Sequence, residues 1–203
     1  MISPAPKIGF LVLAAGLSSR FNGNKLLTKL PNSDLTVLET TLQNIPNDAP
    51  IHVVYRPSMT TQKAMLSRIA ACRPQFSFNG NEDLAEGMGI SIAKGVKDTS
   101  NWDAWVICLS DMPWIETSTY RAIASKLVSN DIVAPFFKAD SGLQKGNPVG
   151  FSKKFLQNLL NLSGDQGGRA IVQDNPEHVC RLTVKDAGIL LDIDYPDDIN
   201  QRQ

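Results

Sequence analysis

The sequence has 203 residues, of which 42% are hydrophobic and 20% are charged, and its formal net charge is +0. These values are typical of one compact globular domain, and they exclude a disordered chain or one that attracts nucleic acid through overall positive charge. Three scattered cysteines (Cys72, Cys108 and Cys180) and two distant histidines give no pattern for a disulfide framework or a zinc site.

The chain begins with MISPAPK, which holds two prolines and no long apolar core. We expect residues 1–7 to form a flexible tail and not a signal peptide. No run in the sequence approaches the ~18–20 apolar residues that a membrane-spanning helix needs. We therefore expect a cytoplasmic protein that binds neither a membrane nor nucleic acid.

Short apolar runs alternate with helical patterns over the first 137 residues. Strands are predicted at 8–14, 51–55, 75–78, 104–110 and 131–137, and helices at about 36–44, 58–72, 87–97 and 116–129. Continuous apolar strands separated by helices indicate a mostly parallel sheet with helices on both faces, which is a three-layer, doubly wound α/β fold. Ligands of such sheets bind beyond the carboxyl ends of the strands.

The pattern changes after residue 137. The segment KADSGLQKGNPVGF predicts an antiparallel hairpin that turns near Ser141-Gly142, and Pro148 indicates an edge position or a strand start. Helices at about 153–162 and 167–174, a strand near 178–183, and an extended piece within 189–199 that enters a terminal helix through Pro196 are predicted to follow. Without an internal repeat or linker, we expect residues 1–203 to form a single domain.

The loop after the first strand, in LVLAAGLSSRFNGNK, combines small residues with two cations. Ala14, Ala15 and Gly16 allow backbone amides to approach a ligand closely, and such amides suit phosphate oxygens. Arg20 and Lys25 together have the charge to neutralise a triphosphate. The dinucleotide fingerprint GxGxxG and the P-loop ending GK[ST] are both absent. The alternative interpretation is a tight turn with a solvated arginine and lysine.

Carboxylates follow the fourth predicted strand and lie near the C-terminus. Asp111, in AWVICLSDMPWI, lies directly after an apolar strand, where a Mg²⁺ ligand is well placed. The alternative is an aspartate that only starts a turn before Pro113. Asp192 and Asp194, in LLDIDYPDDI, are two residues apart, so an extended segment directs both to the same side.

The segment LAAGLSSRFNGNKLL resembles the signature LAAGxSxRFGxxKLL of the MobA-like nucleotidyltransferases, with Asn22 at the usual glycine position. Within that family it is most similar to the molybdenum cofactor cytidylyltransferase branch, since the guanylyl branch typically has Ala-Gly-Gly in this loop. LSDMPWI and DIDYPDDI resemble further family segments, with Tyr195 in place of the usual threonine. The similar segments run from about residue 8 to 199. The resemblance implies the Rossmann-like nucleotide-diphospho-sugar transferase fold.

The resemblance also implies roles for individual residues. Three would be catalytic, namely Arg20, Lys25 and Asp111. Residues that would bind the nucleotide are Leu13, Ala14, Ala15, Gly16, Lys25, Asn79, Gly87, Ser91 and Asp111. Asp111 and Asp192 would hold Mg²⁺, the expected cofactor. KGNPVGF resembles the family's GHPVlF with Asn147 for histidine, and SGDQGGRAIV resembles GDxGaR, so residues expected to bind the acceptor are Asn147, Arg169 and Asp194.

The implied reaction is nucleotidyl transfer. A phosphate of the acceptor attacks the α-phosphorus of a nucleoside triphosphate and pyrophosphate leaves; because the nucleophile is already anionic, no histidine base is needed. The expected partners are CTP and a phosphorylated small molecule, a molybdopterin-type cofactor. A molybdoenzyme would be a transient partner, and the chain would act as a monomer or homodimer.

The sequence leaves three alternatives to this reaction. A related nucleotidyltransferase would act on a sugar phosphate or alditol phosphate. A non-catalytic nucleotide- or cofactor-binding protein would keep the fold without the chemistry. A nicotinamide oxidoreductase is disfavoured, because the sequence lacks the glycine fingerprint of that class.

Overall fold

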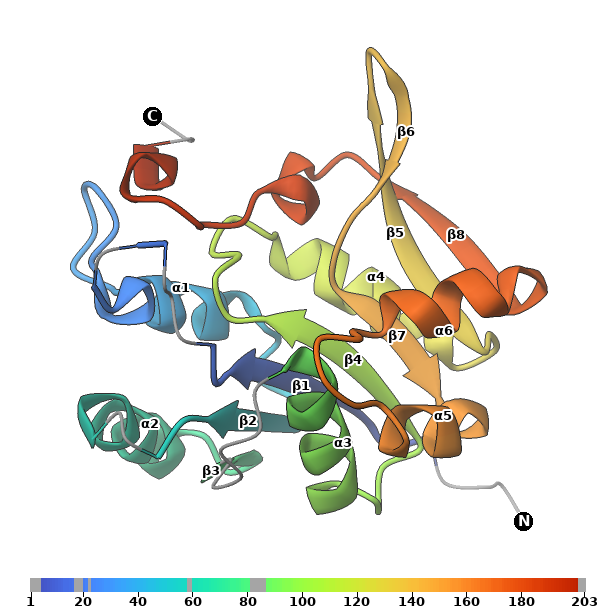
Figure 1. Ribbon diagram of the computed structural model, residues 1–203, viewed down its shortest axis with the longest axis horizontal. Helices are drawn as coiled ribbons and strands as arrows, with labels where there is room; N and C mark the ends of the chain where they lie inside the picture. Colours follow the sequence, from blue (N-terminus) through green and yellow to red (C-terminus); the bar gives the residue numbers. More distant parts are fainter. Residues whose placement is uncertain (1–4, 17–19, 22, 58–59, 81–86, 201–203) are drawn as a thin grey trace.

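The computed structural model describes residues 5–16, 20–21, 23–57, 60–80 and 87–200. These residues contain one sheet of eight strands (Figure 1). The strands are β1 (Ile8–Ala14), β2 (Ile51–Tyr55), β3 (Phe76–Gly80), β4 (Ala104–Leu109), β5 (Ile132–Ala139), β6 (Gly142–Lys145), β7 (Val149–Ser152) and β8 (Val179–Val184). Their order is β3-β2-β1-β4-β7-β5-β6, and β8 pairs with β5.

Helices cover both faces of the sheet (Figure 1). They are α1 (Val37–Asn44), α2 (Thr60–Cys72), α3 (Met88–Asp98), α4 (Thr117–Leu127), α5 (Leu156–Leu160) and α6 (Arg169–Asp174). Buried residues of α1, α2 and α4 belong to one hydrophobic cluster, and those of α3, α5 and α6 belong to another. The predicted three-layer α/β architecture is therefore confirmed.

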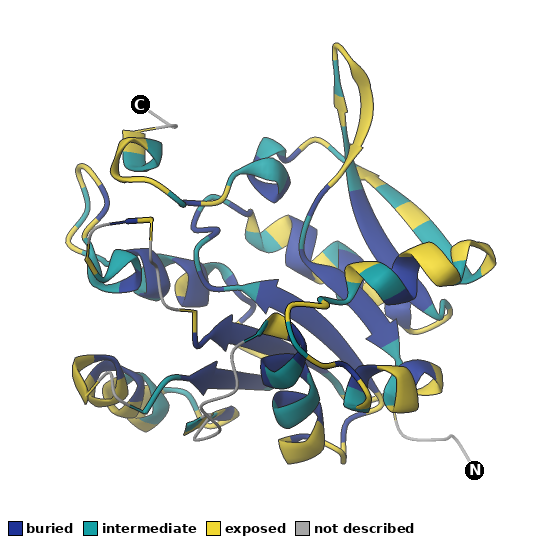
Figure 2. Ribbon diagram, viewed as in Figure 1, coloured by how far each residue is buried: buried dark blue, intermediate teal, exposed yellow. Residues whose placement is uncertain are grey.

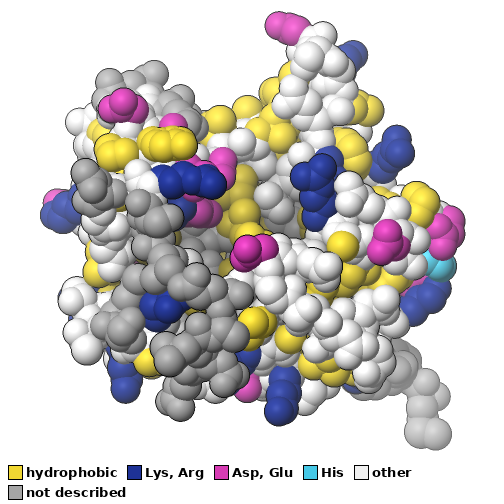
Figure 3. All heavy atoms as spheres, viewed as in Figure 1, with side chains coloured by type: hydrophobic (Ala, Val, Ile, Leu, Met, Phe, Trp, Pro, Cys, Tyr) yellow, Lys and Arg dark blue, Asp and Glu magenta, His cyan; other side chains and the backbone are white. Residues whose placement is uncertain are grey.

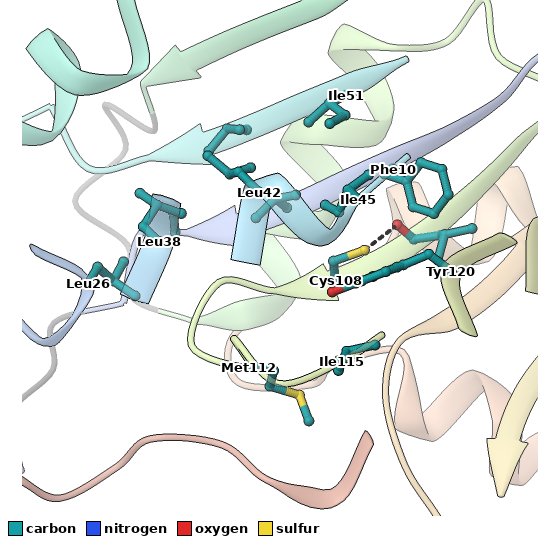
Figure 4. Packing of buried hydrophobic residues seen from close by; sticks show 14 of the residues in the cluster. Phe10, Leu26, Leu38, Leu42, Ile45, Ile51, Cys108, Met112, Ile115 and Tyr120 are labelled. Atoms are coloured by element: carbon teal, nitrogen blue, oxygen red, sulfur yellow. Dashed lines mark hydrogen bonds between the residues drawn. The ribbon is translucent and has the colours of Figure 1, made fainter. Parts of the chain in front are cut away.

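The strands bury both of their faces, which explains why they are continuous apolar runs in the sequence. Phe10 and Val12 of β1 pack in the first cluster, whereas Leu11 and Leu13 between them pack in the second. The inner strands are buried along their length (Figure 2). In the first cluster the aromatic rings of Phe10 and Tyr120 meet edge to face with centroids 5.8 Å apart (Figure 4). The sheet thus forms a rigid platform for the loops at its carboxyl edge.

The antiparallel part of the sheet lies beside β4. β5 and β6 form the predicted hairpin, with Ala139 paired to Gly142 across the turn, and this hairpin projects from the body of the molecule (Figure 1). β7 runs antiparallel to both β4 and β5. It begins directly after Pro148, whose peptide bond with Asn147 is cis. Of the two positions predicted for Pro148, the strand start is therefore correct, and the strand it precedes lies inside the sheet.

Several elements differ in detail from the prediction. The expected helix at 153–162 is a 3₁₀ turn, Lys153–Phe155, followed by the short α5. The expected terminal helix is a 3₁₀ helix, Pro196–Asn200, in which Asp198 accepts the backbone amides of Asp194 and Tyr195. Part of the predicted helix at 58–72 and most of residues 1–7 lie outside the described residues. Lys7, the last tail residue, exchanges two hydrogen bonds with Asp103.

Within the described part of the chain, no helix combines the length and the apolar character needed to cross a bilayer.

Candidate active site

The site lies where β1 and β4 end, next to each other. Leu13 and Leu109 are register partners near the carboxyl ends of these parallel strands, so the turns that follow them lie side by side. Lys25 begins the 3₁₀ helix Lys25–Leu27, and Asp111 is the second residue after β4. Lys25 Nζ is 2.6 Å from Asp111 Oδ2. The lysine of the first loop and the carboxylate after the fourth strand therefore meet in one place.

The C-terminal segment completes this cluster. Lys25 Nζ also donates to the backbone oxygen of Ile193 at 2.7 Å and lies 3.3 Å from Asp194 Oδ1. Arg20 pairs with the other oxygen of the same carboxylate at 2.8 Å. The backbone amide of Ile193 donates to the oxygen of Asp111 at 3.0 Å. These contacts hold the extended residues after Ile189 across the carboxyl edge of the sheet (Figure 1).

The charges in the cluster are strongly coupled. The side chain of Lys25 is only 12% exposed, and burial by itself would lower its pKa. The charge of Asp111 and hydrogen bonds to Asp111 and Asp194 have a larger effect in the opposite direction. The pKa of Lys25 therefore lies above its ordinary value. The pKa of Asp192 is also raised, first by burial and then by the negative charges of Asp111 and Asp194. The site therefore keeps a protonated lysine among carboxylates that repel one another.

One carboxylate oxygen of the cluster is buried without a hydrogen-bond partner among the described residues. Asp111 Oδ1 is buried and has no hydrogen-bond partner among the described residues, whereas Oδ2 accepts from Lys25. A buried unpaired carboxylate oxygen is costly unless a cation or donor meets it. Mg²⁺ prefers oxygen ligands and often takes only one or two carboxylates, with phosphate and water supplying the rest. Asp111, with Asp192 nearby, fits such an ion.

The described residues contain no cluster of three or more His, Cys, Asp or Glu side chains placed to hold a metal by themselves. An ion at this site would therefore need ligands from the substrate, as is usual for magnesium bound with nucleotide phosphates.

Helix α1 fixes the turn that carries Asp111. Thr41, which is completely buried, donates to the backbone oxygen of Ser110 at 3.0 Å. Asn44, one turn further along, donates to the backbone oxygen of Pro113 at 2.8 Å. Both sides of the turn are thereby tied to the same helix face. These two residues could not be predicted from the sequence, because a Thr and an Asn in an amphipathic helix belong to no recognisable motif.

Two further residues hold the loop after β1. Gln62 donates to the backbone oxygen of Ala14 at 3.2 Å, and Arg56 donates to that of Ala15 at 3.1 Å. Both residues come from the β2–α2 region, 48 and 41 positions away from their partners in the chain. The backbone oxygens of Ala14 and Ala15 are thereby held by side chains of the β2–α2 region. No local pattern in the sequence pointed to Gln62 or Arg56.

The remaining residues expected to contact the nucleotide lie around the same edge. The backbone oxygen of Leu13 accepts the amide of Ser110, and no atom of the described residues, apart from Gly16 and its chain neighbours, lies within 4 Å of where a Cβ of Gly16 would be. Gly87 precedes α3 with φ 142°, a conformation that favours glycine, and Ser91 is buried one turn into that helix. Asn79 donates instead to Asp98 at the far end of α3. Asn22, which stands where the family signature has a glycine, lies outside the described residues.

Two of the residues expected to bind the acceptor line a separate hollow next to the cluster. Asn147 and Arg169 lie in the lining of a cavity of 730 Å³ whose wall includes Leu109 of β4. Asp194 does not line this cavity but lies with Lys25 and Arg20. The three predicted acceptor residues are therefore divided between two places, and the acceptor role of Asp194 stays a prediction.

A mostly parallel sheet that is covered by helices on both faces and has a charged cluster at the ends of adjacent strands defines an α/β protein of the Rossmann-like class. Residues 10–179 match the model of the MobA-like NTP transferase domain, and the chain belongs to this family. Both the fold and the family predicted from the sequence are thereby confirmed. No match was found among curated protein sequences.

Solved structures share the whole architecture. Rv0371c from Mycobacterium tuberculosis H37Rv is 25% identical, with 98% of each chain covered and a TM-score of 0.77. A structure of Rv0371c in complex with manganese is 26% identical, with coverage of 96% of this chain and 97% of that chain and a TM-score of 0.71. A nucleotidyl transferase from Methanothermobacter is 18% identical, covers 96% and 95%, and has a TM-score of 0.78, which supports the fold.

Proposed function

We propose that the protein is a Mg²⁺-dependent nucleotidyltransferase that moves CMP from CTP onto a phosphorylated acceptor, a molybdopterin-type cofactor, and releases pyrophosphate. The family supports the class of reaction. The Ala-Ala-Gly loop, which resembles that of the cytidylyl branch, favours CTP. A cytoplasmic location, which the sequence predicts, and a transient molybdoenzyme partner, which the resemblance implies, belong to the same proposal.

The observation that carries the proposal is the 2.6 Å contact between Lys25 and Asp111. A cation for phosphates and a carboxylate for a metal must act on the same triphosphate, so they must lie within a few ångströms of each other. These two residues are 86 positions apart in the chain, and they nevertheless meet at the carboxyl edge of the sheet.

Each residue of the cluster has a defined task in the proposed reaction. Lys25 binds phosphate oxygens of the triphosphate and stabilises the charge that develops on the leaving pyrophosphate. Arg20, whose side chain is 65% exposed, moves from Asp194 to the outer phosphates with its bidentate fork. Asp111 and Asp192 would hold Mg²⁺, which when bound supplies positive charge beside the phosphate under attack. The manganese complex of Rv0371c supports a divalent ion here.

Catalysis then needs no general base. The attacking phosphate is anionic at neutral pH, and neither histidine lies in the cluster: His52 is bonded to Ser77, and His178 to Asp131. The rate enhancement would come from positioning the two anionic substrates and neutralising their repulsion.

The test is a pyrophosphate-release assay with CTP, GTP, ATP and UTP, each with molybdopterin-type cofactor as acceptor and with or without Mg²⁺. We expect release with CTP and Mg²⁺ and none after chelation by EDTA. Release that is equal for all four nucleotides would remove the cytidylyl assignment. Tight CTP binding with no release under any condition would favour a non-catalytic binding protein.

A further inference from the structure

The cavity beside the active site is lined by both charged and apolar residues. Its volume, 730 Å³, is in the range of small-molecule sites. Its titratable lining residues are Lys145, Asp165 and Arg169, so two positive charges face one negative charge. This face of the molecule is hollowed near its centre, with hydrophobic side chains inside the hollow and Lys or Arg side chains beside it (Figure 3).

Lys145 reaches the cavity because of the projecting hairpin. It is the last residue of β6 and the register partner of Phe136, which also lines the cavity. The next residue, Gly146, donates its amide to the oxygen of Pro135 at 2.9 Å, so the base of the hairpin is fixed. A side chain at Gly146 would meet the backbone oxygen of Ile189 at 2.4 Å. The tight backbone contact at Gly146 therefore defines where Lys145 is placed.

Arg169 reaches the same cavity from helix α6. It is the first residue of α6, and Gly168 before it lies on the ring of Phe151, which an added Cβ would approach to 3.0 Å. The two cations influence each other: the pKa of Lys145 is lowered by burial first and then by the positive charge of Arg169. Among the described residues, neither cation forms a salt bridge with a carboxylate, in contrast to Lys25 and Arg20.

The lining between the two cations is apolar. It is formed by residues at the ends of the central strands, namely Ile107, Leu109, Val149 and Phe151. Uncharged polar side chains are few in the lining: Asn147 and Gln173 are the two among the described residues. A polyhydroxylated acceptor would leave most of its hydroxyls without partners against this surface, which is costly.

From this arrangement we infer that Lys145 and Arg169 together bind an anionic group of the acceptor, whose remaining body is flat or apolar and lies on the ends of β4 and β7. This inference rests on the proposed function, since it assigns the cavity to the second substrate. It makes Lys145, which no motif singled out, a specificity-determining residue. It also disfavours a sugar phosphate or alditol phosphate as acceptor.

The test measures binding of simple probes to the whole protein without nucleotide. Phenyl phosphate, glycerol phosphate, inorganic phosphate and phenol are titrated by isothermal calorimetry. We expect phenyl phosphate to bind about tenfold more tightly than each of the other three, because it alone satisfies both the cations and the apolar lining. Equal binding of glycerol phosphate and phenyl phosphate, or no detectable binding of phenyl phosphate, would overturn the inference.

Variants then locate the probe. Lys145→Gln and Arg169→Gln should each weaken phenyl phosphate about tenfold, the loss typical of one charge-assisted hydrogen bond. Both side chains are exposed, so both variants should keep the melting temperature of the wild type. Lys138→Gln, on the same hairpin but outside the cavity lining, is the matched control and should bind as the wild type does. Unchanged binding in both cavity variants would contradict the inference.

A further variant separates this inference from the proposed function. Lys25→Met should weaken CTP binding at least about tenfold but keep phenyl phosphate binding, because Lys25 is not in the cavity lining. If phenyl phosphate binding depends on Lys145 while no nucleotide releases pyrophosphate, the proposed reaction fails and the anion site stands. If pyrophosphate release is observed but Lys145→Gln and Arg169→Gln leave the KM for the acceptor unchanged, the reaction stands and the anion site fails.

Discussion

At the scale of single residues, Lys25 occupies an unusual position, because three oxygens from two distant segments surround its ammonium group. Asp111, Asp194 and the backbone of Ile193 all accept from Nζ within 3.3 Å. A triphosphate entering the site must therefore compete with these partners for the lysine. The triphosphate can displace these partners because its phosphates carry a higher negative charge. The partners of Lys25 therefore change when the substrate binds.

Lys25→Met is predicted to lower kcat/KM for nucleotidyl transfer by about 10²–10³-fold, the loss seen when one preorganised donor to a reacting anion is removed. The reason is that the methionine keeps the length of the side chain but has no charge for the departing pyrophosphate. Steady-state pyrophosphate release measures the effect. Lys29→Met is the control, since Lys29 pairs with Asp34 at the surface. A rate for Lys25→Met equal to that of the control would contradict the assigned role.

His52 gives a prediction for stability against pH. It is 4% exposed, and burial lowers its pKa, with partial compensation from Asp98. In the unfolded chain the histidine has its ordinary pKa of about 6.5, so the unfolded chain takes up a proton more readily than the folded chain. The free energy of unfolding therefore decreases as the pH falls through and below that value. Thermal melts between neutral and mildly acidic pH should show a smaller decrease in Tm for His52→Gln than for the wild type. Parallel curves would show that His52 does not contribute.

Lys25 and Asp111 could be predicted from the sequence because each follows a recognisable strand within a motif. The partners of Lys25 in the C-terminal segment were harder to predict. Ile193 contributes only its backbone oxygen, which no side-chain pattern encodes. Lys145 had no signal either, since its role depends on the hairpin that brings it to Arg169. Long-range placement by the tertiary fold, and not residue type, decides such contacts.

At the scale of elements, α3 packs unusually close to the sheet. Gly95 faces β1 and β2, and a Cβ there would come within 2.3 Å of Leu11 and 2.9 Å of Val54. The glycine therefore lets the helix axis approach the strands. Gly87 precedes the same helix and its first residue, Met88, lines the cavity, so the distance of the helix from the sheet affects the position of that lining residue.

Gly95→Ala is predicted to destabilise the protein by about 1–3 kcal/mol through overpacking, even though alanine has the higher helix propensity. Chemical denaturation measures the change. Lys97→Ala, on the exposed face of the same helix, is the matched control and should lie within about 0.5 kcal/mol of the wild type. A stabilised Gly95→Ala variant would show that the helix has room to move.

The elements that sequence patterns predicted best are the fully buried strands. β1 and β2 have the bounds expected from their apolar runs, because both faces of an inner parallel strand are covered. The C-terminal part was predicted less well. An extended segment that contacts Lys25 and Asp111 lies between two short 3₁₀ helices, Ala187–Leu190 and Pro196–Asn200, whose few hydrogen bonds leave little periodicity in the sequence.

At the scale of the whole molecule, three segments far apart in the chain meet at one edge of the sheet: the loop after β1, the turn after β4 and the extended segment before the C-terminal 3₁₀ helix. Beside them lies the cavity under α6 and the hairpin. A nucleotide at the first place and an acceptor at the second would be neighbours, since β4 contributes Leu109 to the cavity and leads directly to Asp111. The fold thus gives two adjoining sites for a two-substrate reaction.

The central claim is that Lys25 and Asp111 act on one metal-bound triphosphate. It is tested most directly by calorimetric titration of CTP, with and without Mg²⁺, into the wild type, Lys25→Met and Asp111→Asn. The account predicts that Mg²⁺ strengthens CTP binding to the wild type, that Asp111→Asn abolishes this dependence on Mg²⁺, and that Lys25→Met weakens CTP at least about tenfold with or without the ion. Wild-type affinity and the same Mg²⁺ dependence in both variants would contradict it.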